Sequence, residues 1–235
     1  MTPLVTFHAL AIDAVDASAL AAFWARTLGL RAEQPDGGAV ALHGKQPGQT
    51  VWVNPVPEPK TVKQRVHLDV RARSLDDLPG SPRLTEPGQY PWTVLADPEG
   101  GELCVFTYED VADYRLKDVV VDCADPGAVA RWWHGLWGGE LGHDAEHGWW
   151  WIDGAAGVPF ESFDFGPVPE PKTVKNRIHW DVELNPGVTV ADLVAYGARV
   201  VREPDDEIRW TVMADPEGNE FCVFSPGVEE PPYAE

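Results

Sequence analysis

The chain carries two copies of one long sequence pattern, and this internal repeat restricts its fold more than any other feature. Residues 55–70 read PVPEPKTVKQRVHLDV and residues 167–182 read PVPEPKTVKNRIHWDV, so that thirteen of sixteen positions are identical. Residues 92–106 (WTVLADPEGGELCVF) and residues 210–224 (WTVMADPEGNEFCVF) agree at twelve of fifteen positions. A period of about 110 residues matches a small domain and is too long for a solenoid. The chain is therefore a tandem duplication.

We expect two units of similar fold, residues 1–109 and residues 110–227, followed by a disordered tail at residues 228–235. The boundary falls near YEDVADYRL, and the tail is rich in Glu and Pro. The second unit has six more residues than the first between its two repeated blocks. Because sheets of such units have free edges, the two units are expected to pair within one chain as a pseudo-dimer.

Each unit shows the same order of elements. A first strand precedes an Asp that is suited to cap a helix (Asp16 and Asp125), and a glycine ends each apolar helical stripe (Gly29 and Gly138). Strands follow, then the PVPEPK segment, and then a second strand, helix and hairpin around the ADPEG turn. The predicted class is α+β, with two βαβββ modules in each unit and curved mixed sheets.

The charge and the cysteines exclude several classes of function. With 38 acidic and 18 basic side chains the formal net charge is −20, which disfavours binding to nucleic acid or to anionic membranes. No apolar run approaches the length of a membrane span, and the N-terminus lacks the pattern of a signal peptide. Three cysteines without disulfide or metal-clip spacing predict reduced thiols and a cytoplasmic protein.

Together, the helices ending in FW or WW, the KxRxHxDV strand and the closing ADPEGxExCVF block resemble the glyoxalase/bleomycin-resistance/dioxygenase (vicinal oxygen chelate) superfamily. The resemblance is greatest to its actinobacterial glyoxalase-like domains and covers nearly the whole chain twice. It implies modules that curl around a site on the sheet. In metal-dependent members, His or Glu from the first strand of each module and Glu from the last strand hold a divalent ion.

Carried onto this sequence, the resemblance implies that His67 and Glu102 are metal ligands in the first unit. The third ligand would be His8, which shares strand parity with Leu10 and Ile12 and would need a bulge to face the site. The ion would be Mg²⁺, Mn²⁺, Fe²⁺ or Zn²⁺. In the second unit the matches are His179 and Glu220, but Lys117 replaces the third ligand, so this unit is expected to be free of metal.

Strand parity places His67 and Asp69 on one face and the neighbouring apolar residues on the other, and the same holds for His179 and Asp181. Without a metal, Glu102 and Glu220 would instead pair with Arg or His side chains across the site. The PVPEPKTVK segment is interpreted as a connecting arm, with a lid or an anion-binding loop as alternatives.

Eight of the eleven tryptophans follow residue 110. Trp132, Trp133 and Trp137 have helical spacing and are assigned to the core. The strand run Trp149, Trp150 and Trp151 must place at least one indole on the site, because side chains alternate along a strand.

Two functions follow from these features, with a protein-binding scaffold as a weaker third. The first is a small-molecule binder, of sequestering or self-resistance type, with a Trp-lined acidic cleft suited to a planar or cationic ligand. Its tentative cleft residues are Asp69, Trp149, Trp150, Trp151, His179, Asp181 and Glu220. The alternative is a metal-dependent lyase, isomerase, dioxygenase or thiol transferase that uses His8, His67 and Glu102. The sequence names no catalytic residue beyond these.

Overall fold

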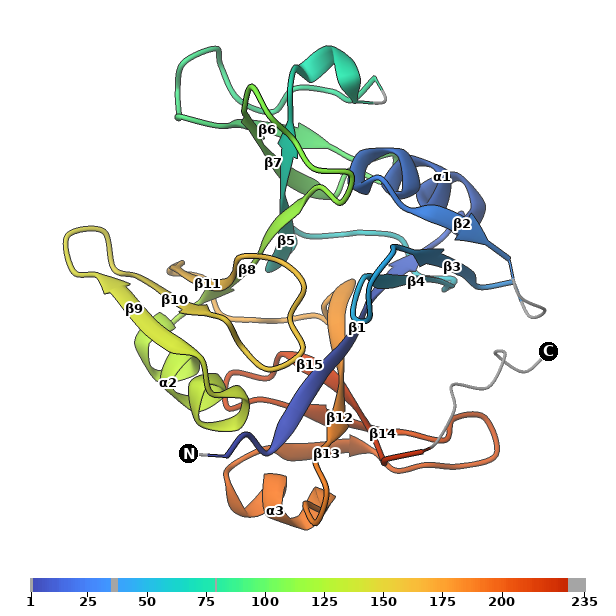
Figure 1. Cartoon of the computed structure of the whole chain (residues 1–235), viewed down its shortest axis with the longest axis vertical. Coiled ribbons are helices and arrows are strands. Elements are labelled where there is room, and N and C mark those ends of the chain that lie inside the picture. Colours follow the sequence, from blue (N-terminus) through green and yellow to red (C-terminus); the bar gives the residue numbers. More distant parts are fainter. Residues whose placement is uncertain (1, 35–37, 79, 228–235) are drawn as a thin grey trace.

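The protein folds into two mixed β-sheets with three α-helices in its described residues, as seen in a computed structural model (Figure 1). The structure describes residues 2–34, 38–78 and 80–227, so the predicted tail at residues 228–235 lies outside the described residues. The elements of the first half are β1 (Val5–Ala14), α1 (Ala17–Leu28), β2 (Arg31–Glu33), β3 (Val40–His43), β4 (Thr50–Pro55), β5 (Val66–Ala72), the 3-10 turn η1 (Leu75–Asp77), β6 (Thr93–Ala96) and β7 (Glu102–Thr107). The elements of the second half are β8 (Leu116–Cys123), α2 (Pro126–Trp137), β9 (Glu140–Asp144), β10 (Trp149–Asp153), β11 (Ser162–Pro167), β12 (Ile178–Leu184), α3 (Val190–Ala195), β13 (Arg199–Arg202), β14 (Thr211–Ala214) and β15 (Glu220–Phe224).

Each sheet combines strands from both halves of the chain. The eight-stranded sheet has the order β13-β14-β15-β12-β1-β4-β3-β2, and the seven-stranded sheet has the order β6-β7-β5-β8-β11-β10-β9. The two halves join through antiparallel pairs, β1 with β12 and β5 with β8. In Figure 1 the strands β5–β7 of the first half lie at the top, away from β2–β4, while β12–β15 of the second half lie at the bottom. The two modules of one half therefore belong to different sheets.

The first helix of each half begins and ends at the residues that the sequence predicted. The Asp16 carboxylate accepts a hydrogen bond from the Ala19 amide at 2.9 Å, and Asp125 accepts one from Ala128 at the same distance. Gly29 ends α1 in the left-handed conformation with φ 73°. A Cβ atom at this position would lie 1.9 Å from the main-chain oxygen of Asp113, so only glycine fits.

The repeated ADPEG turn connects the second module of each half, through hydrogen bonds, to the start of the first helix of the same half. Asp97 Oδ1 accepts hydrogen bonds from the amides of Glu99 and Gly101 at 2.8 and 2.7 Å. The Glu99 carboxylate then accepts hydrogen bonds from the Val15 and Asp16 amides at the start of α1. In the second half, Asp215 and Glu217 make the equivalent bonds to their own turn and to the start of α2. The contacts support a structural role for this turn.

The two second modules differ in their helical content. A helix was expected in both, but the described residues of the second module in the first half contain only the 3-10 turn η1, whereas the second half forms α3 with a Thr189–Asp192 capping box. The first half has six fewer residues at this point, and its segment SLDDLPGSPRL contains two prolines and a glycine. This composition opposes a regular helix. The expectation of a helix in the first half was therefore wrong.

One hydrophobic core fills the space between the helices and one side of each sheet. The rings of Trp133 and Trp137 stack at 4.2 Å between centroids, and Trp137 stacks on Phe163 at 4.5 Å. All three side chains are fully buried, so the core assignment is confirmed for Trp133 and Trp137, whereas Trp132 is only partly buried. We call the sides of the two sheets that turn away from this core the eight-strand face and the seven-strand face.

Candidate functional site

Each face carries a compact group of one histidine, one aspartate and one cysteine. On the seven-strand face the side chains of His67, Asp69 and Cys104 bring one ligand atom each to within 4.8 Å of the others. The alternation of β5 produces this arrangement, since Val66, Leu68 and Val70 enter the core and the residues between them face away. Cys104 joins the group because the parallel pairing of β5 and β7 sets it opposite Asp69.

The eight-strand face carries the equivalent group. His179, Asp181 and Cys222 also lie within 4.8 Å of one another, and Cys222 stands opposite Asp181 in the pairing of β12 with β15. Both groups therefore come from the repeated KxRxHxDV and ADPEGxExCVF blocks. The sequence had identified the histidines and aspartates as site residues, but had predicted the cysteines only to be reduced thiols.

Burial favours the uncharged form of each side chain in the first group. His67 Nε2 lies 3.6 Å from Asp69 Oδ1, and burial lowers the pKa of His67 to about 4. Burial also raises the pKa of Asp69 well above its usual value, and the nearby carboxylates of Asp118 and Asp164 raise it further. The pKa of the Cys104 thiol is raised by burial and by Asp69. A protonated thiol is a poor nucleophile.

The donor atoms of these groups fit a divalent metal ion. Within the described part of the chain, the buried atoms Asp69 Oδ1 and His179 Nδ1 have no hydrogen-bond partner, which is unusual for buried polar atoms. A set of imidazole, carboxylate and thiolate suits Zn²⁺ or Fe²⁺ better than Mg²⁺. His67, Asp69 and Cys104 would hold such an ion on one face, and His179, Asp181 and Cys222 on the other.

The two predicted glutamate ligands are paired with lysines. Glu102 Oε1 lies 3.4 Å from Lys60 Nζ, and the second carboxylate oxygen accepts a hydrogen bond from the Gln64 amide. Glu220 lies 2.7 Å from Lys172 Nζ and accepts a hydrogen bond from the Asn176 amide. Both carboxylates are thus paired, as in the metal-free alternative, but the partner is a lysine and not the expected Arg or His.

A β-bulge decides the orientation of His8. The pairing of β1 with β12 shifts between Phe7 and Ala9, so His8 is the extra residue. Its ring lies 5.7 Å from that of Phe224, whose strand neighbours Phe221 and Val223 enter the core. His8 therefore lies on the eight-strand face, and the parity argument that grouped it with Leu10 does not hold.

The structure does not bring the three predicted ligands of the first unit together. His8 is on β1 of the eight-stranded sheet, whereas His67 and Glu102 are on β5 and β7 of the seven-stranded sheet. The physical reason is the exchange of modules, which sets β1 beside β12 and not beside β5. His8 shares its face with the His179 group.

Lys117 occupies the same bulge on the seven-strand face. The pairing of β5 with β8 shifts between Asp118 and Leu116, which leaves Lys117 as the extra residue. Its ammonium group forms ion pairs with Asp118 and, at 3.2 Å, with Glu161, and it lies 5.0 Å from the centre of the Phe106 ring. Although burial opposes the charge, these carboxylates raise the pKa of Lys117.

Three carboxylates meet beside this lysine. Asp69 stands opposite Asp118 in the β5–β8 pairing, and Ser162 Oγ lies 3.0 Å from Asp118 Oδ1 and 2.6 Å from Asp164 Oδ1. A hydroxyl group has one proton, so it can donate to only one of two carboxylates. Burial and the charge of Asp118 raise the pKa of Asp164 to about 7, which favours a proton on this carboxyl group compared with an ordinary aspartate.

Aromatic rings flank the carboxylates on both sides. Ile152 of β10 enters the core, so Trp149 and Trp151 lie on the seven-strand face, and Trp151 pairs across the strands with Asp164. On the other side, the Trp92 ring lies 5.5 Å from that of Phe106 and stacks on Tyr90. The expectation that the Trp run contributes to a site face agrees with this geometry.

Trp150 points to the opposite side of the sheet from Trp149 and Trp151. The guanidinium of Arg131 on α2 lies 4.8 Å from its ring centre, and His143 stacks on it. The predicted cleft residues are therefore divided: Asp69, Trp149 and Trp151 share the seven-strand face, His179, Asp181 and Glu220 belong to the eight-strand face, and Trp150 belongs to neither.

The eight-strand face lacks the acidic residues at the equivalent positions. Ala9 stands where the seven-strand face has Asp118, and Trp52 stands where it has Asp164. Ala9, Ala11, Ala41 and Trp52 form a small apolar cluster there. The sequence prediction missed Asp118 and Asp164 and considered Lys117 only as the replacement of a metal ligand, because only the strand register across the two halves places these residues beside Asp69.

Comparisons with known proteins agree with this geometry. The family model described as "Glyoxalase-like domain" matches residues 9–106 and again residues 118–224. Glyoxalase I from Zea mays superposes with a TM-score of 0.67 at 12% identity, over 93% of this chain and 92% of that one. A putative dioxygenase from Bacillus subtilis superposes with a TM-score of 0.64 at 14% identity, over 100% of this chain and 88% of that one. The cppA protein from Streptococcus pneumoniae gives a TM-score of 0.52 at 11% identity, over 95% and 99%.

At these identities the solved structures establish the fold alone. Curated protein sequences give no match to this chain. In the described ranges, no helix has the length and apolar character needed to cross a membrane.

Proposed function

This chain belongs to the glyoxalase-like domain family, and from that premise we propose that it binds a flat, cationic small molecule on its seven-strand face. The observation that carries the proposal is a group of three carboxylates, in which Asp118 and Asp164 share the Ser162 hydroxyl and Asp69 stands opposite Asp118. A cationic ligand would supply positive charge that this group lacks.

The charges near the group are unbalanced. Lys117 is the one described basic residue that forms an ion pair with any of the three carboxylates, and it also pairs with Glu161. Buried like charges disfavour one another, and a cation that enters the site relieves this repulsion. Binding would displace the proton held near Asp164, so the affinity for a cation is expected to increase between pH 6 and pH 8.

The indole rings explain the preference for a flat ligand. Trp149 and Trp151 lie beside the carboxylates on one side, and Trp92 and Phe106 on the other. Aromatic faces attract cations and stack on planar rings, with each contact contributing about 1 kcal/mol. The protonated state of the Cys104 thiol supports binding without covalent chemistry, as in a sequestering or self-resistance protein.

The test is a titration of the protein with proflavine, a planar cation, followed by quenching of Trp fluorescence at pH 8. Acridine has the same ring system and is uncharged at this pH. We expect Asp164→Asn and Trp151→Leu each to weaken proflavine binding about tenfold. Trp52→Leu, which alters the equivalent position of the other face, should leave the affinity unchanged.

Two results would contradict the proposal. One is equal affinity for proflavine and acridine, which would mean that charge is not recognised. The other is loss of binding in Trp52→Leu but not in Trp151→Leu, which would move the ligand to the eight-strand face.

A second candidate function is metal-dependent catalysis as a lyase, isomerase, dioxygenase or thiol transferase. The two His-Asp-Cys groups favour it, because they present three different ligand atoms within 4.8 Å. A bound divalent ion would act as a Lewis acid toward substrate oxygens. His67, Asp69 and Cys104 would hold it beside Lys117 and Asp118, which are placed to bind a substrate and to accept a proton.

Metal analysis after incubation with Zn²⁺ or Fe²⁺ tests this second function. On this hypothesis Cys104→Ala and Cys222→Ala each remove one equivalent of metal, while Glu102→Ala, whose carboxylate pairs with Lys60, retains both. A wild-type protein that binds no metal would exclude the hypothesis. The three free cysteines support the further proposal of a reducing, cytoplasmic location.

A further inference from the structure

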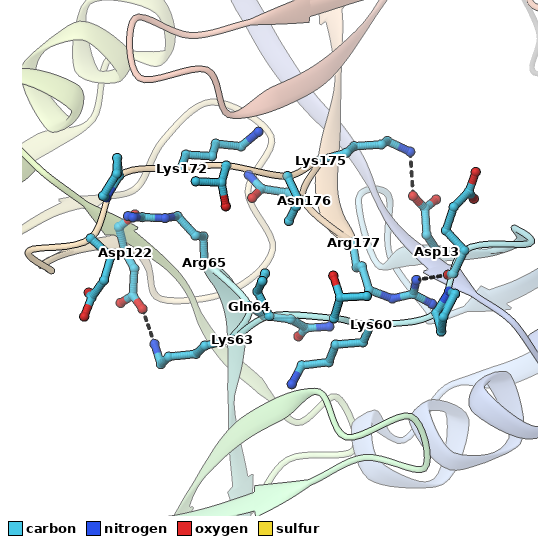
Figure 2. A pocket seen from close by; sticks show the side chains of 18 of the residues that line it. Asp13, Lys60, Lys63, Gln64, Arg65, Asp122, Lys172, Lys175, Asn176 and Arg177 are labelled. Carbon is cyan, nitrogen blue, oxygen red and sulfur yellow. Dashed lines mark hydrogen bonds and ion pairs between the residues drawn. The ribbon is translucent and has the colours of Figure 1, made fainter.

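A cavity of about 950 Å³ lies between the two copies of the repeated arm, residues 56–65 and 168–177 (Figure 2). Asp13 at the end of β1 and Asp122 near the end of β8 complete its wall. Every lining residue of one half has its repeat counterpart in the other half, so the cavity is nearly symmetric between the halves. Its volume is that of a typical small-molecule site.

Positive charge is concentrated around this cavity. Six of the eighteen basic residues of the chain line it: Lys60, Lys63, Arg65, Lys172, Lys175 and Arg177. The protein as a whole carries a net charge of −20, so a cluster of six basic residues is exceptional on it. Four carboxylates also line the cavity, and two of them, Asp13 and Asp122, form ion pairs with Lys175 and Lys63.

Five of the six cations are held by carboxylates of the protein. Lys60 and Lys172 pair with Glu102 and Glu220, and Lys63 and Lys175 pair with Asp122 and Asp13. Arg177 Nη2 lies 2.6 Å from Glu99 Oε2. These pairs position the basic side chains around the cavity but leave little net charge at each one.

Arg65 is the exception. Its guanidinium donates one hydrogen bond, to the main-chain oxygen of Asp122 at 3.1 Å, and it forms no ion pair with any described residue. A guanidinium has five N–H donors in a planar fork that matches a carboxylate, sulfonate or phosphate group. Arg65 therefore has N–H donors that no described carboxylate accepts within ion-pair distance, whereas Arg177 is paired with Glu99.

The wall between the cations is apolar. It includes valines and prolines from both arms, among them Val62 and Val174, which are 44% and 43% exposed. Exposed valines facing a cavity favour a ligand that buries them. The cavity thus combines apolar surface with one guanidinium that forms no ion pair with a described residue.

We propose that this cavity binds an organic anion with an apolar body, whose acidic group pairs with Arg65. The cavity lining contains none of Asp69, Asp118 and Asp164, and the proposed ligand has the opposite charge, so the two proposals depend on different residues. Either proposal can fail without the other.

The fluorescent probe 8-anilinonaphthalene-1-sulfonate tests the proposal, since it combines an apolar body with one anionic group. Its uncharged relative N-phenyl-1-naphthylamine serves as the matched ligand. We expect one sulfonate probe to bind per chain, at least tenfold more tightly than the uncharged relative. Arg65→Gln should weaken binding of the sulfonate about tenfold, and Arg65→Lys should restore most of it.

A second variant keeps the test valid if Arg65→Gln does not fold. Val62→Glu adds a negative charge at an exposed position of the cavity and should weaken binding at least tenfold. Val201→Glu makes the same change at a position of β13 that is 47% exposed and outside the cavity, and it should leave binding within twofold of wild type. Equal affinities of Val62→Glu and Val201→Glu, or equal affinities for the two probes, would overturn the proposal.

Discussion

The seven-strand face and the eight-strand face each combine strands of a first module with strands of a second module. The residues from the second modules are alike on the two faces, and those from the first modules differ. The second modules supply His67, Asp69 and Cys104 on the seven-strand face, and His179, Asp181 and Cys222 on the eight-strand face. The first modules supply the residues that differ between the two faces. There, Lys117, Asp118 and Asp164 of the seven-strand face correspond to His8, Ala9 and Trp52.

The comparison teaches that the repeated motifs form a shared frame, and that the chemistry of each face is set by the strands paired with that frame. The bulge is present on both faces, but it carries a lysine on one and a histidine on the other. Three carboxylates make the seven-strand face acidic, while three alanines and a tryptophan make the other face apolar. The four experiments below test this division.

The largest effect is a pH-dependent gain in stability from Asp164→Asn. The pKa of Asp164 is about 7 in the folded protein and near 3.8 in the unfolded chain. Between these values the folded state binds more protons, so the contribution of this group to stability falls as the pH rises. The variant should be more stable than wild type by about 4 kcal/mol at pH 8 and nearly equal to it at pH 4, as urea denaturation would measure. An equal difference in the free energy of unfolding at pH 4 and pH 8 would show that ionisation of Asp164 is not its cause.

The next effect is expected from Asp118→Ala. The Lys117 side chain is only 18% exposed, and this change leaves its charge with Glu161 as the remaining partner. The loss of a buried partner should lower the free energy of unfolding by about 3 kcal/mol, measured by urea denaturation at pH 7. Combining it with Lys117→His reproduces the His8–Ala9 pair of the other face and should recover at least half of the loss. A double variant no more stable than Asp118→Ala would show that the two bulges are not interchangeable.

A smaller and equal effect is expected at the two helix caps. Asp16→Ala and Asp125→Ala each remove one capping hydrogen bond of 2.9 Å, and each should lower the free energy of unfolding by about 1 kcal/mol. Thermal unfolding of both variants provides the measurement. The control is Asp110→Ala, which changes an exposed aspartate outside the helices. Effects that differ by more than about twofold would show that the two first modules are not equivalent scaffolds.

The smallest effect concerns the thiols of the shared frame. Cys104 and Cys222 are 8% and 6% exposed, and burial raises the pKa of each. Neither should react measurably with a disulfide reagent at pH 8 in the native protein, whereas all three cysteines should react in denaturant. Rapid reaction of one but not the other would break the equivalence of the two frames.

Much of the fold was predictable from local patterns. The repeat gave the number of modules, and the capping aspartates and terminal glycines gave the limits of α1 and α2. Capping and helix termination depend on neighbouring residues, so a sequence contains the necessary information. The wrong expectation of a helix at η1 also has a local cause, since the shorter segment and its prolines are visible in the sequence.

The composition of each face was not predictable in the same way. Strand parity correctly separated His67 and Asp69 from the core, because alternation is a property of one strand. It misplaced His8, because a single extra residue in a bulge reverses the parity and leaves no clear mark in the sequence. It also joined His8 to His67, although the pairing of β1 with β12 depends on contacts across more than 160 residues.

The exchange of modules between the sheets has a consequence for how such a molecule can change. If two identical single units assembled in this manner, every substitution would appear on both faces at once, and the faces would remain copies. A chain that contains both units escapes this restriction, because a mutation alters one face and leaves the other intact. The covalent link also delivers the two unlike faces in a fixed ratio of one to one, at a fixed position relative to each other.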